Sequence, residues 1–201
     1  MLLTRAAIGL LLILSALGHL SACQHQVRQP APSDPTWAKL EAELLTALNQ
    51  LRLNPRAYAQ QIPAGRLPPT VLRDLQQRQS LSPLRPAAGL TQAARDWITT
   101  PPKGKTNEQA WASHLRRYGR WELLAARQQS VGYIRGAALL EALLADEGTR
   151  EHRYHLLHPL YRRVGIACGP EPRHGSQCLI VYAGGFHPGR PAPPPPNPNP
   201  P

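Results

Sequence analysis

The chain has 201 residues and a formal net charge of +11 at pH 7, which suits one domain with appended segments rather than several domains. Its arginines are scattered, and no basic run alternates with aromatic residues, so we expect no nucleic-acid partner. In a cell envelope, this positive charge instead favours binding to lipid head groups or to another anionic envelope ligand.

The N-terminal segment has the features of an export signal. Arg5 precedes an apolar run that is too short to span a bilayer comfortably and that ends in small residues. The tetrad Leu20–Cys23 resembles a bacterial lipobox, whose cysteine carries lipid and becomes the first mature residue. This resemblance implies that residues 1–22 are a lipoprotein signal peptide and that Cys23 is the lipidation site. The alternative is an ordinary signal peptide cut near Ala22, which would leave a soluble protein.

Both ends of the expected folded domain carry appended segments. Residues 23–34 form a polar tether that follows the lipid anchor, and residues 188–201 form a proline-rich tail that we expect to be disordered and polyproline-like. Gln24, rather than Asp, follows the cysteine, which in Gram-negative lipoproteins favours the outer membrane. We therefore expect a protein anchored in the bacterial outer membrane and facing the periplasm, with a folded domain over residues 35–187.

Apolar spacing predicts a series of helices in the first part of the domain. The first begins at Asp34, which can cap it, and Pro35, and it presents leucines three and four residues apart until Pro55 ends it. Further helices are expected at "RAYAQQI", "TVLRDLQQ", "QAARDWI" after a Thr91 cap, "EQAWASHLRRYG", and "YIRGAALLEALLADEG" with Gly148 as its stop. The segment "WELLAA" is expected to be extended or a short loop.

The sequence of the last part of the domain predicts a β-hairpin whose two strands are joined by a disulfide. "RRVGIAC" and "CLIVYAGGF" are rich in strand-forming residues, and the nine residues between them are rich in turn formers. In an oxidising compartment Cys168 and Cys178 tend to pair, and a loop this short contributes roughly 2–3 kcal/mol in the chain-entropy model. The alternative is two buried free thiols. Helices followed by an antiparallel hairpin predict an α+β fold with helices packed on a small sheet.

Several motifs occur in an order typical of one family. "ALNQLRLNPRAYAQ" contains Asn49, Arg52 and Asn54, "RRYGRWELLAA" contains Glu122, and "ALLADEGTREHRYHLLHPLYRRVGIACG" contains His152. With "LTQAARDW" and "VYAGGF", they resemble the motifs of the CAP superfamily, also called SCP/TAPS, in its bacterial form. The resemblance covers nearly all of residues 36–187 and implies an α-β-α sandwich with a small antiparallel sheet.

The resemblance also implies a cleft. In its full form the family's cleft holds two histidines and two acidic residues that can bind a divalent metal such as zinc. Residue by residue, His152 falls on the second histidine, Glu122 on one glutamate, and Asp146 near the other acid. The first histidine is expected at or soon after position 97, where this chain has Trp97. The candidate metal ligands are therefore only Glu122 and His152, and Asp146 completes the candidate cleft.

The stretch "EHRYHLLHP" places three histidines at three-residue spacing. On a helix, His152, His155 and His158 would point over an arc of about 120°, so they could not converge on one ion without other ligands. We therefore expect His152 to be the cleft residue, and His155 and His158 to be packing or surface residues. His174 and His187 are expected to be solvated.

Three functions remain open from the sequence. The leading hypothesis is a non-enzymatic module that binds a ligand or partner in a cleft with Glu122 and His152, since neither Ser113 nor Ser130 lies in a nucleophile motif. A hydrolase that acts through a metal-bound water is the first alternative. A structural spacer in the envelope, built from the anchor, domain and proline tail, is the second.

Overall fold

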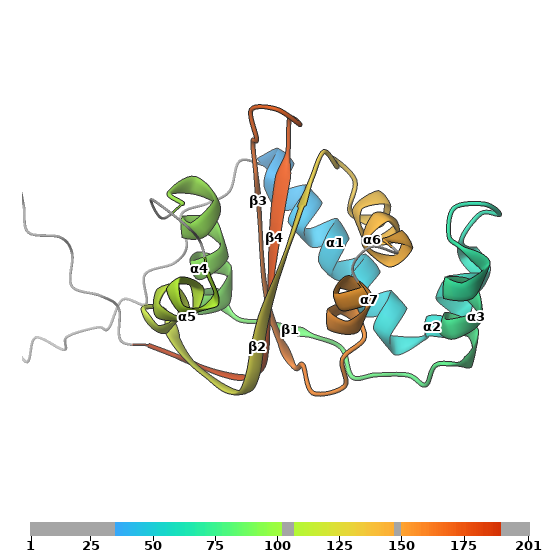
Figure 1. The fold of residues 1–201 in the computed structure, drawn as a ribbon, viewed down its shortest axis with the longest axis horizontal. Coiled ribbons are helices and arrows are strands. Elements are labelled where there is room, and N and C mark those ends of the chain that lie inside the picture. The colour runs from blue at the N-terminus through green and yellow to red at the C-terminus, as the bar shows by residue number, and fades with distance from the viewer. Residues whose placement is uncertain (1–34, 102–106, 147–149, 190–201) are drawn as a thin grey trace, which may run out of the picture.

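The fold is that of a computed structural model, which describes residues 35–101, 107–146 and 150–189, without the side chains of residues 35 and 150–152. A four-stranded sheet lies between two groups of helices (Figure 1). Helices α1, α6 and α7 lie on one side of the sheet, and α4 and α5 lie on the other. The predicted α-β-α sandwich is confirmed.

The described residues form seven helices. They are α1 (Pro35–Leu53), α2 (Pro55–Gln61), α3 (Pro69–Gln77), α4 (Ala88–Thr99), α5 (Glu108–Arg116), α6 (Gly136–Ala145) and α7 (Arg150–Leu156). Asparagine side chains cap two of them: Asn54 accepts from a backbone N–H of α2 at 3.0 Å, and Asn107 accepts from one of α5 at 2.8 Å.

The sheet has the strand order β1-β3-β4-β2. Its strands are β1 (Arg85–Pro86), β2 (Gly119–Val131), β3 (Arg163–Gly169) and β4 (Gln177–Pro188). β4 pairs antiparallel with both β2 and β3, whereas the short β1 runs parallel to β3. The sheet is therefore mixed, and not wholly antiparallel as the sequence suggested.

Alternation along β4 divides the interior into two clusters. Ile180 and Tyr182 pack with α1, α6 and α7, while Leu179 and Val181 pack with α4 and α5. Helix α4 approaches the sheet closely at a glycine of β3. A Cβ on Gly165 would lie 2.2 Å from the backbone of Leu90, so α4 packs directly on β3.

The hairpin of β3 and β4 is stapled as predicted. Cys168 and Cys178 are register partners with a Cα–Cα distance of 4.1 Å, and their disulfide is present. Both cysteines are buried, at 3% and 1% exposure, so the bridge belongs to the core rather than to the surface.

Three predicted elements differ from the structure. α4 begins at Ala88 and not after Thr91, since Ala87 occupies the N-cap position. α6 begins at Gly136, so Ile134 lies outside the helix and is 78% exposed. β2 has 13 residues, far more than "WELLAA", because its polar second half pairs with β4 and buries Gln128 against Tyr182.

Some expectations fall outside the described residues. They concern the signal peptide, the Cys23 anchor and the tether within residues 1–34, and the proline-rich tail from residue 190 onward. In the part of the chain that the structure describes, no helix is both long enough and apolar enough to cross a membrane.

Candidate functional site

Glu122 lies on β2, opposite Gly185 of β4. Its neighbour Trp121 packs against the α4–α5 cluster, so strand alternation directs Glu122 to the face that α7 covers. His187 donates a hydrogen bond from Nε2 to Oε1 of Glu122 at 2.5 Å, and both side chains are exposed by more than half. A Cβ on residue 185 would lie 2.5 Å from Oε2 of Glu122, so the carboxylate lies directly over the bare backbone of Gly185.

The backbone beside Glu122 is irregular. The β2–β4 register shifts between Glu122 and Ala125, as in a β-bulge. Within it Leu123 has a φ of 61°, in the left-handed region that leucine rarely adopts, and it is 79% exposed. Such strain is commonest at functional sites, and here it coincides with a large apolar side chain left in solvent.

His152 lies in α7, which packs beside β2 on the face toward which Glu122 points. The structure does not describe the side chain of His152, so the contact between Glu122 and His152 stays a prediction. Asp146 is the half-buried C-cap residue of α6, and its backbone N–H donates to Ala142 at 3.1 Å. The structure therefore brings the helix of His152 to the Glu122 face of the sheet and leaves the role of Asp146 untested.

Arg52 fixes the position of the segment that follows His152. Its side chain is fully buried, and its guanidinium donates to the carbonyl of Ser82 and to three carbonyls in and after α7, those of Leu156, His158 and Tyr161, at 2.8–3.2 Å. Burial lowers the pKa of Arg52 to about 10, and the group remains charged at neutral pH. The sequence marked Arg52 as a motif residue but gave no sign of these backbone partners.

The other two histidines of the "EHRYHLLHP" stretch have partners within the protein. His155 stacks on Tyr182, with ring centroids 6.2 Å apart, and its Nδ1 lies 3.3 Å from the Tyr161 hydroxyl. His158 accepts a hydrogen bond from the backbone N–H of Leu160 at 3.2 Å, and burial lowers its pKa. Both contacts agree with packing or surface roles.

Trp97 takes part in a separate aromatic cluster on the α4–α5 face. Its ring meets that of Trp111 edge-on at 5.0 Å, and the Arg127 guanidinium lies over both rings. The position where the family's first histidine was expected is thus a buried packing site on the other face of the sheet. Across the described residues, no three His, Cys, Asp or Glu side chains are grouped so as to hold a metal ion, so these residues alone do not fit one.

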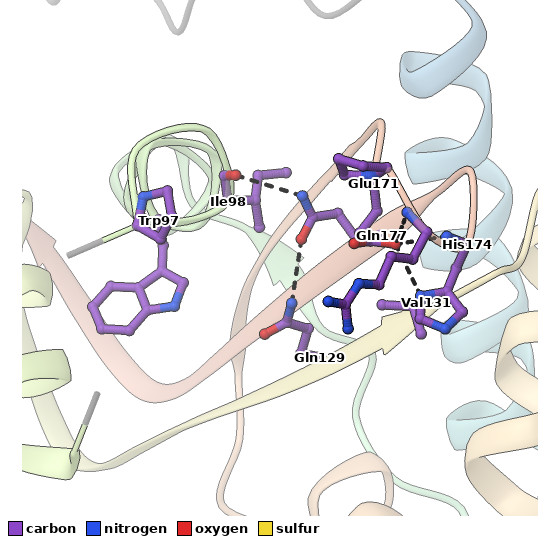
Figure 2. Close-up of a pocket in the computed structure, with 10 residues that line it drawn as sticks. Trp97, Ile98, Gln129, Val131, Glu171, His174 and Gln177 are labelled. Carbon is purple, nitrogen blue, oxygen red and sulfur yellow. Dashed lines mark hydrogen bonds and ion pairs between the residues drawn. The ribbon is translucent and has the colours of Figure 1, made fainter. Parts of the chain in front are cut away.

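A cavity of about 580 Å³ lies at the opposite end of β2 (Figure 2). It is lined by residues from the end of α4, the end of β2 and the β3–β4 turn: Trp97, Ile98, Pro101, Gln129, Val131, Glu171, Pro172, Arg173, His174 and Gln177. Its polar groups largely satisfy one another. Gln129 donates to Gln177 at 3.2 Å, and Gln177 donates to Pro170 at 3.1 Å.

The turn beside this cavity is organised by one carboxylate. Glu171 accepts from the backbone N–H groups of Arg173 and His174 and from the His174 ring, at 2.7–2.9 Å. These hydrogen bonds lower the pKa of the Glu171 carboxyl, although desolvation opposes them. His174 was expected to be solvated; it is exposed, and it also has this local partner. Because the polar groups are engaged with one another, the cavity gives no clear ligand chemistry.

A family model described as the cysteine-rich secretory protein family, CAP, matches residues 45–183. The chain belongs to the CAP family. The matched region contains Glu122, Asp146 and His152, whereas His187 lies beyond it. A search of curated proteins gave no match.

Solved structures with the CAP fold resemble this chain at low identity. A cysteine-rich secretory protein from Staphylococcus aureus has a TM-score of 0.46 and 16% identity, over 76% of this chain and 40% of its own. An extracellular SCP-domain protein from Bacillus anthracis has a TM-score of 0.43 and 15% identity, over 76% and 44%. Ancylostoma-secreted protein Ac-ASP-7 has a TM-score of 0.42 and 20% identity, over 75% and 70%. This CAP chain thus spans less than half the length of the two bacterial proteins.

Proposed function

We propose that the protein is a lipid-anchored CAP domain of the bacterial envelope that binds a ligand or partner without catalysis, in a cleft between β2 and α7. The observation that carries this proposal is the exposed Glu122 carboxylate, which is held by His187 on the face beside the helix of His152. The strained, exposed Leu123 next to it supplies an apolar contact for a ligand that also has a polar group.

The surroundings of Glu122 support binding rather than nucleophilic catalysis. A nucleophile needs a base within hydrogen-bond reach, and the base needs a third group that orients it. Within the described part of the chain, the partner of the Glu122 carboxylate is the imidazole of His187, and no serine, threonine or cysteine side chain hydrogen-bonds to either residue. The pair can therefore orient a ligand, whereas none of the hydroxyls or thiols that the structure describes is placed for it to activate.

Molecules that co-purify with the protein test the binding site. Native mass spectrometry of the chain extracted from its own membranes is expected to show a bound molecule that is lost in both Glu122→Gln and His152→Ala. The matched control is His174→Ala, an exposed histidine at the other end of the sheet, which should retain the molecule. Equal retention by all three variants would place the ligand elsewhere and contradict the proposal.

His187 favours a metal-dependent hydrolase as the alternative function. Its imidazole lies 2.5 Å from the Glu122 carboxylate and would add a second histidine to a site that contains His152. Elemental analysis of the purified protein separates the two functions. The binding proposal predicts no stoichiometric metal. A tightly held metal that is lost in His152→Ala or His187→Ala would favour the hydrolase.

The anchor and the tail have tests of their own. Cys23→Ser should release the protein from the membrane fraction, and persistent membrane association in salt washes would contradict lipidation as the anchor. If the protein were instead an envelope spacer, deletion of residues 188–201 would impair its cellular role while the cleft variants left it intact. The binding proposal predicts that the cleft variants impair the cellular role and that the deletion of residues 188–201 does not.

A further inference from the structure

Three arginines meet at one end of the sheet. Arg85 of β1 and Arg163 of β3 are direct register partners, and the backbone N–H of Arg85 donates to the carbonyl of Arg162 at 2.9 Å. Paired residues on neighbouring strands lie about 5 Å apart and point to the same face. The side chains of Arg85 and Arg163 therefore leave the sheet side by side, and Arg162 adjoins them.

None of the acidic side chains that the structure describes neutralises the charges of these arginines. Other described arginines pair with acids, namely Arg66, Arg78, Arg95 and Arg127. No carboxylate of the described residues lies within ion-pair distance of Arg85, Arg162 or Arg163, and Arg162 donates only to backbone carbonyls, those of Pro159 and Tyr161. Like charges on directly paired strand positions destabilise a sheet, and an anion bound from outside would offset the repulsion between Arg85 and Arg163.

Exposed apolar side chains lie in the segment that leads to these arginines. Leu160 is 47% exposed and Tyr154 is 57% exposed, and the ring of Tyr154 contacts that of His158 at 4.7 Å. Leu160 directly follows Pro159, whose carbonyl accepts from Arg162. Arginines without a described acidic partner, next in the chain to an exposed leucine, form a combination that suits the interface of an anionic bilayer, where guanidinium groups bind phosphates and apolar groups enter the boundary.

We propose that this surface, which we define as Arg85, Arg162 and Arg163 with Leu160, docks on the anionic lipid bilayer to which the chain is anchored. The proposal rests on the envelope location given above, and not on the Glu122 cleft. The reach of the tether permits it. α1 begins at Pro35, and its last turn carries Arg52, which contacts the Tyr161 carbonyl beside the docking surface. That helix spans about 28 Å, whereas the 12 residues 23–34 can extend to roughly 40 Å.

Vesicle sedimentation tests the docking surface without the lipid anchor. The chain from residue 24 onward retains every described element and should bind vesicles that contain phosphatidylglycerol but not vesicles of phosphatidylcholine alone. The triple variant Arg85→Gln, Arg162→Gln, Arg163→Gln should bind roughly 100-fold more weakly, since each arginine near an anionic surface contributes about a five-fold factor. Leu160→Ser should weaken binding severalfold at every salt concentration.

A matched control separates this surface from the bulk charge. The triple variant Arg56→Gln, Arg73→Gln, Arg173→Gln removes the same charge from exposed arginines that form no ion pair with a described residue, and it should lose only a few-fold in affinity. Equal losses in the two triple variants would overturn the proposal in favour of non-specific attraction. Absence of binding by the unsubstituted chain would also overturn it.

Further measurements keep the test of the docking surface decisive. If the first triple variant fails to fold by circular dichroism, Arg162→Gln alone should still weaken binding about five-fold or more, since its side chain contacts only carbonyls. Inorganic phosphate that binds the arginines while anionic vesicles do not would assign the site to a free anion and overturn docking on lipid. Glu122→Gln should bind vesicles like the unsubstituted chain. The two proposals can therefore fail separately: loss of the docking surface would not affect the Glu122 cleft, and loss of the cleft would not affect the docking surface.

Discussion

The imidazole of His187 donates a 2.5 Å hydrogen bond to the carboxylate of Glu122 across the β2–β4 pair, in solvent and over the bare backbone of Gly185. Their side chains are 61% and 59% exposed, so water screens the interaction. A pair in this setting contributes little to folding and leaves the carboxylate accessible. The arrangement therefore suits a ligand-binding site better than an interaction that stabilises the fold.

Glu122→Gln and His187→Gln should each change the free energy of unfolding by less than about 1 kcal/mol, because exposed ion pairs are worth no more than that. Urea denaturation monitored by tryptophan fluorescence measures the change. The ligand retention described above should nevertheless be lost in Glu122→Gln. A loss of several kcal/mol in either variant would mean that the pair holds the fold together, which would undermine its assignment to a binding site.

Arg52→Met should be among the most destabilising substitutions in the domain. It leaves four carbonyls without the charged donor that joins α1 to the end of α7. We expect a loss of about 3 kcal/mol or more in the free energy of unfolding. Arg56→Met removes an exposed arginine one turn later and should stay within about 0.5 kcal/mol. Similar effects of the two substitutions would show that the carbonyls find water instead.

The Cys168–Cys178 disulfide should stabilise the domain through its closed loop. Replacing both cysteines with alanine is expected to cost about 3 kcal/mol in urea denaturation, from the chain-entropy model for a separation of 10 residues. Mass spectrometry without reductant should show no alkylatable thiol in this pair. Two reactive thiols in the folded, exported protein would refute the bridge in the cell.

His114 should make stability sensitive to mild acid. Nε2 of its buried ring lies 2.8 Å from the Ala93 carbonyl, and Nδ1 accepts from Arg117. The neutral ring therefore has a hydrogen-bond partner at each nitrogen. Burial lowers the pKa of His114 below 6.5. The unfolded chain therefore takes up a proton first as the pH falls, and stability present above about pH 6.5 is lost below it.

The free energy of unfolding at pH 7.5 and 5.5 checks this sign. The unsubstituted chain should lose up to about 1 kcal/mol more over this interval than His114→Gln does. The control His174→Gln replaces an exposed histidine and should keep the full pH dependence. An unchanged slope in His114→Gln would assign the acid sensitivity to other groups.

Much of the fold could be predicted from the sequence, because local patterns carry it. The leucines of α1, among them Leu40, Leu44 and Leu48, recur at helical spacing and are all buried. The hairpin strands are rich in residues that favour strands, and the cysteines lie next to its turn. β2 was mostly missed since its second half is polar, and residues such as Gln128 become interior only once the strand pairs with β4 and the Tyr182 hydroxyl donates to the Gln128 side chain.

The site could be predicted only in part. Family motifs pointed to Glu122 and to the helix of His152, whereas nothing local connects Glu122 with His187, which lies 65 residues away. His187 was expected to be solvated; its exposure was predicted correctly and its partner was not. The β-bulge that leaves Leu123 exposed and the carbonyls that surround Arg52 likewise depend on register and on distant loops.

The most direct test of the shared cleft is the distance between the Glu122 carboxylate and the His152 ring in a crystal structure of the chain from residue 24. We predict that they lie about 3 Å apart, or about 5 Å apart with one bridging water or ligand atom between them. Side chains that point away from each other, with the His152 ring turned into solvent on the far side of α7, would contradict the account.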